Sequence, residues 1–216
     1  MKVMILAAGR GTRLAPLTDH TPKPMLPIKG KPLIEWQIRA LARAGFSELV
    51  INLHHLGEQI EAHLGAGHDL GVSISYSYEQ NLLETGGGVK HALPLLGDGP
   101  FAILNGDIWT DFDFANLPNF PDDGAPAQIV LTPTPKWRDR GDFEYANGKV
   151  TARGTRYVYC GIAVLRPELL YDQREGAFSL RDVYFDLINQ GHLRANLFTG
   201  TWLDIGTVEQ YNSLNA

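Results

Sequence analysis

Glycines and basic side chains gather near the N-terminus in a pattern that suits phosphate binding. Gly9, Gly11 and Arg13 follow a short apolar run, and Lys23 stands ten residues further on, between two prolines. Glycines let a backbone approach a phosphate group closely and point its N–H groups at the anion, while basic side chains supply charge. The prolines restrict the backbone around Lys23, which suits a lysine that keeps its position during a reaction. The segment therefore predicts a binding site for a small polyanion.

Two common phosphate-binding motifs do not fit these residues. The P-loop pattern, GxxxxGK followed by Ser or Thr, is absent. The dinucleotide pattern GxGxxG fails because Leu14 stands where its third glycine belongs. A P-loop triphosphatase and a Rossmann-type dehydrogenase are therefore both disfavoured.

The complete run of residues 9–28, GxGTRLxPLTxxxPKPMLPI, closely resembles the signature of the sugar-1-phosphate nucleotidylyltransferases, and the resemblance covers nearly the whole chain. It implies that Arg13 binds the triphosphate tail of a nucleotide and that Lys23 lies at the α-phosphate, so that both serve catalysis. It also implies contacts to the nucleotide from the glycine-rich loop, at Ala8, Gly9, Gly11 and Thr12.

Residues 84–88, Glu-Thr-Gly-Gly-Gly, form a second glycine-rich segment at the start of an expected helix. Three glycines at such a place invite a flat ring or an anion onto the backbone, although a flexible helix cap that binds nothing has the same composition. The resemblance implies that this segment packs against the nucleobase. We therefore expect the backbone at Gly86, with Gln80, to contact the base.

Two aspartates far apart in the sequence are the candidate metal ligands. Asp107 follows an apolar strand, where an isolated aspartate often caps a turn. The resemblance instead makes Asp107 a ligand of Mg²⁺ next to the nucleotide, with Asp204 of the late WLDIGT element as its partner. Magnesium prefers one or two carboxylates together with phosphate oxygens and water. Asp111 and Asp113 are more typical of turn or N-cap residues.

The chemistry implied by the resemblance needs no protein nucleophile. A phosphate oxygen of the acceptor sugar attacks the α-phosphorus of the nucleotide in line and expels pyrophosphate, while the protein supplies positioning and positive charge. The resemblance is strongest to a bacterial subgroup that transfers UMP from UTP to N-acetylmuramic acid 1-phosphate in cell-wall recycling. The segments that carry this finer resemblance are residues 52–56, 83–88, 105–111 and 140–143.

The acceptor site is predicted from fewer residues. Gly141 matches a family glycine whose backbone contacts the sugar, Tyr159 stands where some relatives place an acceptor-binding asparagine, and Asn105 is expected to contact the acceptor substrate. A glutamate that many relatives use for sugar hydroxyls is missing between Lys149 and Tyr157. Arg156, with its basic neighbours on an expected hairpin, would instead pair with the lactyl carboxylate of muramic acid, unless these cations simply face solvent.

Other assignments stay open at this point. Guanylyltransferases for mannose 1-phosphate and uridylyl- or thymidylyltransferases for glucose 1-phosphate share the N-terminal signature. A non-catalytic nucleotide-sugar sensor would keep the fold alone, but the presence of Arg13, Lys23, Asp107 and Asp204 argues against it.

Apolar runs alternate with helical patterns along the chain, which is typical of crossovers in a mainly parallel sheet. We predict one α/β domain, a Rossmann-like (GT-A-like) nucleotidyltransferase fold with a mainly parallel mixed sheet and no C-terminal β-helix. Residues 1–110 would form its nucleotide-binding half and residues 111–216 its sugar-phosphate-binding half. The expected strands are residues 3–8, 48–53, 72–78, 101–105, 128–132, 157–165, 193–198 and 202–205, and the expected helices are residues 31–44, 58–64, 87–96, 180–189 and 208–214, with a hairpin turning at residues 147–148.

Composition excludes several other classes of protein. The formal net charge is −5, with six basic residues against Asp19 alone in residues 1–32, which argues against nucleic acid as a partner and for a local polyanion site. The apolar start is too short for a signal peptide or a membrane span, so the cytoplasm is expected. The single cysteine, Cys160, excludes an internal disulfide and is expected to be a small buried side chain.

Overall fold

The computed structural model describes residues 1–117 and 124–216. In this part of the chain nine strands form one mixed sheet in the order β5-β4-β1-β6-β11-β8-β12-β10-β9. The elements, in chain order, are β1 (Val3–Leu6), β2 (Pro27–Ile28), β3 (Lys31–Pro32), α1 (Leu33–Arg43), β4 (Glu48–Leu53), α2 (Gly57–Leu64), β5 (Ser73–Tyr78), α3 (Glu84–Leu96), β6 (Phe101–Asn105), β7 (Ile108–Thr110), β8 (Ala127–Pro133), β9 (Phe143–Ala146), β10 (Lys149–Arg153), β11 (Tyr157–Leu165), α4 (Glu168–Tyr171), α5 (Leu180–Asn189), β12 (Leu193–Leu197), β13 (Trp202–Asp204) and α6 (Val208–Asn215).

The order of the parallel strands creates a binding edge. From β1 the chain steps outward to β4 and β5, and it then returns to β6 on the opposite side of β1. The strand order therefore reverses beside β1, and in open α/β sheets ligands bind beyond the carboxyl ends of the strands at such a point. The segments that leave β1 and β6 at this edge are the predicted phosphate loop and the stretch that carries Asp107.

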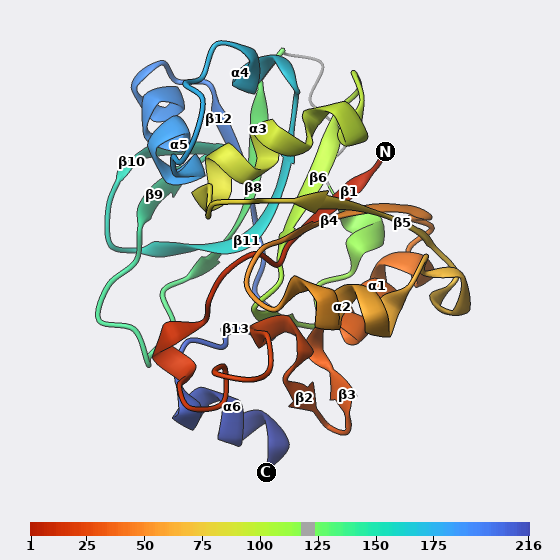
Figure 1. Cartoon of the computed structure of the whole chain (residues 1–216). Helices are drawn as coiled ribbons and strands as arrows, with labels where there is room; N and C mark the ends of the chain where they lie inside the picture. Colours follow the sequence, from red (N-terminus) through yellow and green to blue (C-terminus); the bar gives the residue numbers. More distant parts are fainter. Residues whose placement is uncertain (118–123) are drawn as a thin grey trace.

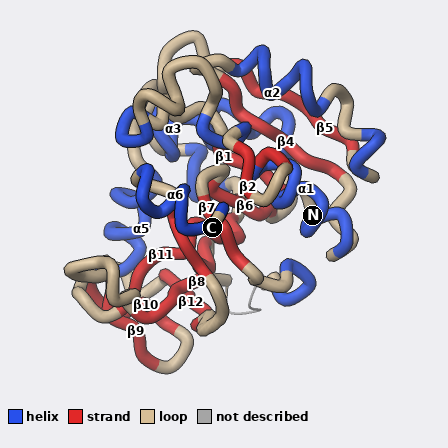
Figure 2. Tube along the Cα trace, turned by 90° about the horizontal axis from the view of Figure 1, so that it is seen from below, coloured by secondary structure: helices blue, strands red, loops and turns tan. Residues whose placement is uncertain are grey.

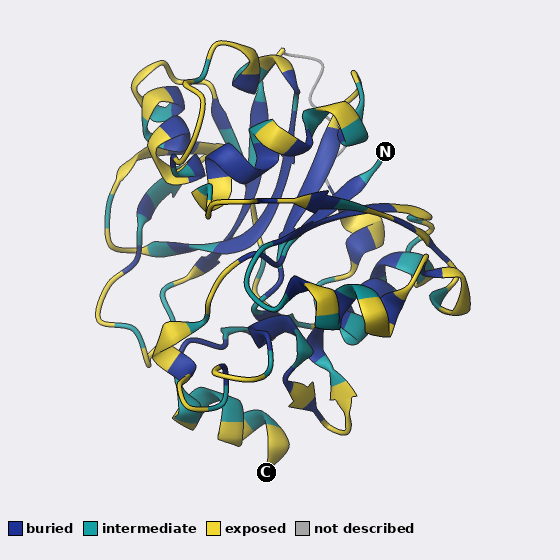
Figure 3. Ribbon diagram, in the orientation of Figure 1, coloured by how far each residue is buried: buried dark blue, intermediate teal, exposed yellow. Residues whose placement is uncertain are grey.

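Alternation of side chains along β1 divides the core into two layers. Val3 and Ile5 pack on one face of the sheet with apolar residues of α1 and α2, whereas Met4 packs on the other face with residues of α3 and α5. Figure 1 shows these helix pairs on opposite faces of the sheet, and Figure 3 shows the buried strands between helices whose outer sides are exposed. Each fully buried apolar side chain contributes about 1.5–3 kcal/mol to folding, so the two layers hold the binding edge rigid.

A third, smaller core fastens the N-terminal loop to the end of the chain. Leu14 and Ile28 pack with Ile205, and residues of α6 cover them. Figure 2 shows α6 beside β2 and β7, and Tyr211 donates a hydrogen bond to the carbonyl of Pro27. The phosphate loop and the WLDIGT element are therefore held together although they lie at opposite ends of the sequence.

The predicted α/β class, the mixed sheet and the predicted strands and helices are confirmed, with boundaries shifted by a few residues. The hairpin turns at Asn147 and Gly148, which both have positive φ. The largest shift is in α3, which begins at Glu84 rather than at residue 87 because Phe178 accepts hydrogen bonds from the backbone of the first two glycines. No helix in the described residues is long and apolar enough to cross a bilayer.

Candidate active site

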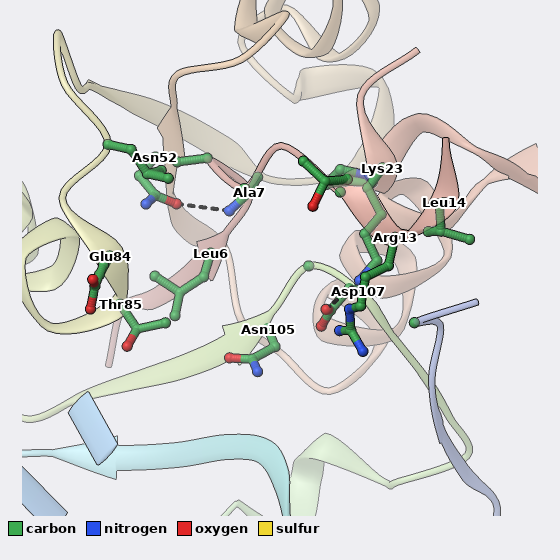
Figure 4. A pocket seen from close by; sticks show the side chains of 18 of the residues that line it. Leu6, Ala7, Arg13, Leu14, Lys23, Asn52, Glu84, Thr85, Asn105 and Asp107 are labelled. Atoms are coloured by element: carbon green, nitrogen blue, oxygen red, sulfur yellow. Dashed lines mark hydrogen bonds and ion pairs between the residues drawn. The ribbon is translucent and has the colours of Figure 1, made fainter. Parts of the chain in front are cut away.

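A cavity of about 440 Å³ opens at the binding edge, between the loop after β1 and the start of α3. Figure 4 shows Arg13, Lys23 and Asp107 together on one side of it, with Glu84 and Thr85 on the opposite side. Most of the residues predicted for the nucleotide line this cavity: Ala8, Gly9, Gly11, Thr12, Arg13, Lys23 and Asp107, together with Asn105.

Lys23 lies at the centre of the charged side of the cavity. Its ammonium nitrogen is 2.5 Å from Oδ2 of Asp107, and the residue as a whole is only 9% exposed. Burial of a charged lysine is unfavourable unless a partner compensates it. The ion pair with Asp107 provides that compensation, and it also fixes the ammonium group where it can meet an incoming phosphate.

Asp204 reaches the same place through a small two-stranded sheet. Its strand β13 pairs antiparallel with β7, so that Asp204 lies opposite Ile108, and the N–H of Ile205 donates to the carbonyl of Asp107 at 2.9 Å. The pKa of the Asp204 carboxyl is raised by burial and by the negative charge of Asp107, although nearby cations, Lys23 first among them, oppose the shift. The two predicted metal ligands are therefore close enough to repel each other.

The backbone and packing at Gly9 and at Gly11 differ, and only one of the two positions requires glycine within the described structure. Gly11 has a φ of +64°, and a Cβ there would meet the side chains of Thr18 at 3.0 Å and Lys23 at 3.1 Å, so the position combines a left-handed backbone with close packing. A Cβ at Gly9 would meet nothing within 4 Å. Packing among the described residues therefore does not require glycine at position 9. A ligand that approaches the backbone closely at this point of the cavity lining would require it.

Arg13 is positioned by the C-terminal element. Its guanidinium packs against Gly206, where a Cβ would lie 2.9 Å from Nη1. Gly206 itself lines the cavity and follows Asp204 by two residues. The glycine of the WLDIGT element thus gives the arginine of the N-terminal loop room to point into the cavity.

A buried polar network, which no sequence motif predicted, holds the opposite side of the cavity. Asn52 accepts from the N–H of Ala7 at 2.8 Å and donates to Oε1 of Glu79 at 2.7 Å, while Oε2 of Glu79 accepts from the N–H of Leu83 at 2.9 Å. Glu79 is 5% exposed. The network ties the start of the phosphate loop to the start of α3, and an asparagine within the otherwise apolar end of β4 is the signal that marks it.

Replacing Asn52 by Ala should destabilise the fold by about 1–3 kcal/mol, because it leaves the buried Ala7 N–H and Glu79 Oε1 without their partner. Urea denaturation followed by circular dichroism measures the change. Asn81→Ala is the matched control, since Asn81 is exposed. An Asn52→Ala midpoint equal to that of the control would contradict the role given to this network.

Two residues predicted to contact the base do not line the cavity. Gln80 is exposed and absent from the lining, and the N–H of Gly86 donates to the carbonyl of Phe178 at 2.8 Å. A Cβ at Gly86 would overlap the ring of Phe178, so its glycine serves packing of α3. The residues that do line this side include Leu82, Glu84 and Thr85, which precede or flank the glycines.

A second cavity, of about 200 Å³, adjoins the first. Leu6, Thr85, Asn105 and Ser179 line both cavities, so a molecule in one can touch a molecule in the other. The second cavity is further lined by Asp142, Phe143, Tyr159, Leu180, Arg181 and Tyr184.

Of the residues predicted for the acceptor, Asn105 and Tyr159 line this second cavity, and the other two do not. Gly141 is buried, its N–H donates to the carbonyl of Thr155, and a Cβ there would collide with Tyr157. Arg156 is exposed and stacks its guanidinium over the ring of Tyr157, 5.6 Å from its centre.

The arrangement suits transfer of a phosphorus-containing group. One cavity offers a lysine, an arginine and loop backbone to a polyphosphate, and the adjoining cavity can hold an acceptor. Asp107 belongs to the lining of the first cavity, and Asp204 lies beside Asp107 without being part of that lining. Phosphoryl-type transfer depends on positioning and charge stabilisation, which these groups supply.

Comparison with known proteins points to the same type of reaction as the geometry of the site. The chain is 42% identical to the N-acetylmuramate alpha-1-phosphate uridylyltransferase of Neisseria meningitidis serogroup B, over 96% of this chain and 94% of that protein. It is 35% identical to the protein of the same name from Caulobacter vibrioides, over 94% of this chain and 90% of the relative. A solved structure of a Bacillus anthracis protein in complex with sucrose, 22% identical, superposes with a TM-score of 0.86 and covers 100% of this chain and 94% of its own. Residues 2–216 match the family model described as nucleotidyl transferase, and the chain belongs to that family.

Proposed function

We propose that this chain transfers UMP from UTP to N-acetylmuramic acid 1-phosphate, giving UDP-N-acetylmuramic acid and pyrophosphate. The structural observation that carries the reaction type is the pair of adjoining cavities, which share Leu6, Thr85, Asn105 and Ser179. Support for the substrate pair comes from the two relatives named N-acetylmuramate alpha-1-phosphate uridylyltransferase, which match this chain over nearly their whole length.

The first cavity binds the triphosphate in this proposal. Arg13 contacts the β- and γ-phosphates, and Lys23 lies at the α-phosphate, where negative charge gathers as the new bond forms. Backbone N–H groups of Ala8, Gly9, Gly11 and Thr12 surround the tail. Residues 1–110 supply most of this lining, and residues 111–216 supply all of the residues found only in the second cavity, which supports the division into a nucleotide half and an acceptor half.

Asp107 and Asp204 are proposed to hold Mg²⁺. Two mutually repelling carboxylates, one paired with Lys23 and one with a raised pKa, form a donor set whose charge a divalent cation would offset. Among the described residues no three His, Cys, Asp or Glu side chains cluster as a metal site, so the remaining ligands would be phosphate oxygens and water. The ion would neutralise charge on the phosphates and help to align them.

The reaction then needs only alignment of the two substrates. An oxygen of the acceptor phosphate forms a bond to the α-phosphorus of UTP, the bond from that phosphorus to the oxygen bridging to the β-phosphorus breaks, and pyrophosphate leaves with the bonding electron pair. Lys23 stabilises the charge that develops on the α-phosphate. Asn105, which lines both cavities, is placed to contact the acceptor phosphate. The proposed reaction draws on UTP, and we place it in the cytoplasm.

Initial rates of pyrophosphate release test the substrate pair. UTP, GTP and dTTP are each combined with the 1-phosphates of N-acetylmuramic acid, glucose and mannose in the presence of Mg²⁺. We expect the highest kcat/KM for UTP with N-acetylmuramic acid 1-phosphate. Turnover of GTP with mannose 1-phosphate, or of UTP or dTTP with glucose 1-phosphate, without turnover of the muramic acid pair would replace our proposal by one of those activities.

A further inference from the structure

The second cavity contains one charged side chain whose charged group has no partner in the described part of the chain. Arg181 lies in the first turn of α5 and lines the cavity, and its guanidinium makes no hydrogen bond or ion pair with any other described residue. The other charged residue in the lining, Asp142, has its Oδ1 3.6 Å from Nη2 of Arg138, and its Oδ2 accepts from the N–H of Tyr159. The charge of Asp142 is therefore compensated, and the cavity retains an uncompensated positive charge.

The backbone at the start of α5 does not supply further anion donors. The N–H of Leu180 donates to Oγ1 of Thr85, that of Arg181 donates to Oγ of Ser179, and that of Asp182 donates to the carbonyl of Ser179. The first N–H groups of a helix usually attract anions because they lack partners. Here they are already paired, so an anion in this cavity has to be bound by side chains.

Tyr184 supplies a second, independent sign of a ligand. It follows Arg181 by three residues, so both side chains lie on the same face of α5. Tyr184 is 2% exposed, lines the cavity, and packs edge-to-face against Tyr159 with ring centres 5.6 Å apart. The hydroxyls of Tyr159 and Tyr184 are both buried, and neither has a hydrogen-bond partner among the described residues other than the hydroxyl of the other.

In this tyrosine pair one of the two O–H groups is always left without an acceptor. If one hydroxyl donates to the other, the second O–H proton still has no acceptor in the described structure. A buried unpaired donor costs about 1–3 kcal/mol, and an oxygen acceptor on a ligand in the cavity would remove that cost. The cavity therefore offers a guanidinium and an O–H donor to a group that carries negative charge and only accepts hydrogen bonds, as a carboxylate does.

The hairpin cations, in contrast, are engaged elsewhere. The guanidinium of Arg153 lies 4.2 Å from the ring centre of Phe185, and Arg156 stacks over Tyr157 with its Nε 3.8 Å from a Glu144 oxygen. Neither arginine lines either cavity. A charged residue of α5 is thus a better candidate partner for the lactyl carboxylate than Arg156 of the hairpin, which the sequence had suggested.

We infer that Arg181, together with the hydroxyl pair of Tyr159 and Tyr184, binds the carboxylate of the acceptor's lactyl ether and so selects N-acetylmuramic acid 1-phosphate over sugars without an acid group. The inference rests on the proposed function, because only an acceptor with a carboxylate uses these groups. Apolar contacts from Leu6, Phe143 and Leu180 would pack against the sugar in the same cavity.

The first test is Arg181→Met, which removes the charge and keeps an apolar stem on an exposed helix position. We expect the KM for N-acetylmuramic acid 1-phosphate to rise about 10- to 100-fold, the range for a lost charge-assisted hydrogen bond, with kcat and the KM for UTP unchanged. N-Acetylglucosamine 1-phosphate, which lacks the lactyl ether, should inhibit the variant and the original protein with the same inhibition constant. Arg153→Met is the matched control and should leave all four constants unchanged.

The second test is Tyr184→Phe, which separates binding from stability. Because the hydroxyls of Tyr159 and Tyr184 have no partner but each other, removing one of them leaves one unpaired O–H donor, as before, and should not lower the melting temperature of the free protein. A hydroxyl with further structural partners would lower it when removed. The same variant should raise the KM for the muramic acid substrate and leave the inhibition constant of N-acetylglucosamine 1-phosphate unchanged.

Failures of the two proposals give different results. If the original protein does not turn over UTP with N-acetylmuramic acid 1-phosphate, the proposed function is lost, and the carboxylate subsite with it. If the original protein is active and Arg181→Met has an unchanged KM for the acceptor, only the subsite is overturned. The subsite would also be overturned if Arg181→Met weakened binding of N-acetylmuramic acid 1-phosphate and of N-acetylglucosamine 1-phosphate equally. It would likewise be overturned if Arg153→Met or Arg156→Met, and not Arg181→Met, raised the KM for the acceptor.

Discussion

Asp204→Asn should lower kcat by about 10³-fold, the effect of losing several kcal/mol of metal-assisted charge stabilisation, and should nevertheless raise the melting temperature of the metal-free protein. Activity falls because asparagine is a poor ligand for a hard cation compared with a carboxylate. Stability rises because burial and the charge of Asp107 make the ionised Asp204 carboxylate unfavourable in the folded chain. Steady-state kinetics and thermal unfolding in EDTA measure the two effects.

The sign of the stability change depends on pH. The pKa of Asp204 is higher in the folded chain than in the unfolded one, so the wild-type protein loses stability as pH rises through that folded pKa. The advantage of Asp204→Asn should therefore be present at neutral pH and disappear in acid, where the wild-type carboxyl is also uncharged. Asp172→Asn, at an exposed position, is the control. Full Mg²⁺-dependent activity in Asp204→Asn would exclude Asp204 as a ligand, and a lower melting temperature at neutral pH would refute the repulsion.

Lys23→Met should lower kcat by about 10²–10³-fold, the range for removal of one preorganised group that stabilises transition-state charge. Unlike Asp204→Asn, it should also destabilise the protein, because Asp107 loses its partner at 2.5 Å and Asp204 loses the first of the cations that oppose its raised pKa. Two variants whose kcat falls for related reasons should thus shift the melting temperature in opposite directions.

Two further variants sharpen the prediction for Lys23. Lys23→Arg should not restore activity, since Lys23 packs against Gly11 between two prolines and a guanidinium differs in size and geometry from an ammonium group. Lys29→Met changes the same charge at an exposed position 5.9 Å from the ring centre of Trp109 and should leave kcat unchanged. A Lys23→Met variant with nearly full kcat would show that the lysine serves only to pair with Asp107.

The N-terminal half of the candidate site could be predicted because its residues are neighbours in the sequence. Gly9 to Arg13 lie three to seven residues after the end of the buried strand β1, and Lys23 lies ten residues after Arg13, so one continuous motif contains most of the candidate phosphate site. Strands and helices of ordinary length were predicted for the same reason, since periodicity of side chains is local. The two-residue strands β2 and β3 were not, because two residues show no period.

The remaining parts of the site depend on contacts between distant segments. Asp204 reaches Asp107 only through pairing of β13 with β7, and the sequence pointed to it through family resemblance rather than through spacing. Arg181 comes two residues after Ser179, the N-cap of α5, and belongs to no motif, so nothing local distinguished it from Arg153 or Arg156. What separates these arginines is that α5 faces the second cavity while the hairpin arginines stack on aromatic rings.

A competition experiment tests the central claim most directly. Equal concentrations of UTP, GTP and dTTP are incubated with the 1-phosphates of N-acetylmuramic acid, N-acetylglucosamine, glucose and mannose and with Mg²⁺, and the early products are identified by mass spectrometry. Our account predicts UDP-N-acetylmuramic acid as the main nucleotide sugar, formed in equal amount with pyrophosphate. Another nucleotide sugar as the main product, or orthophosphate in place of pyrophosphate, would contradict it.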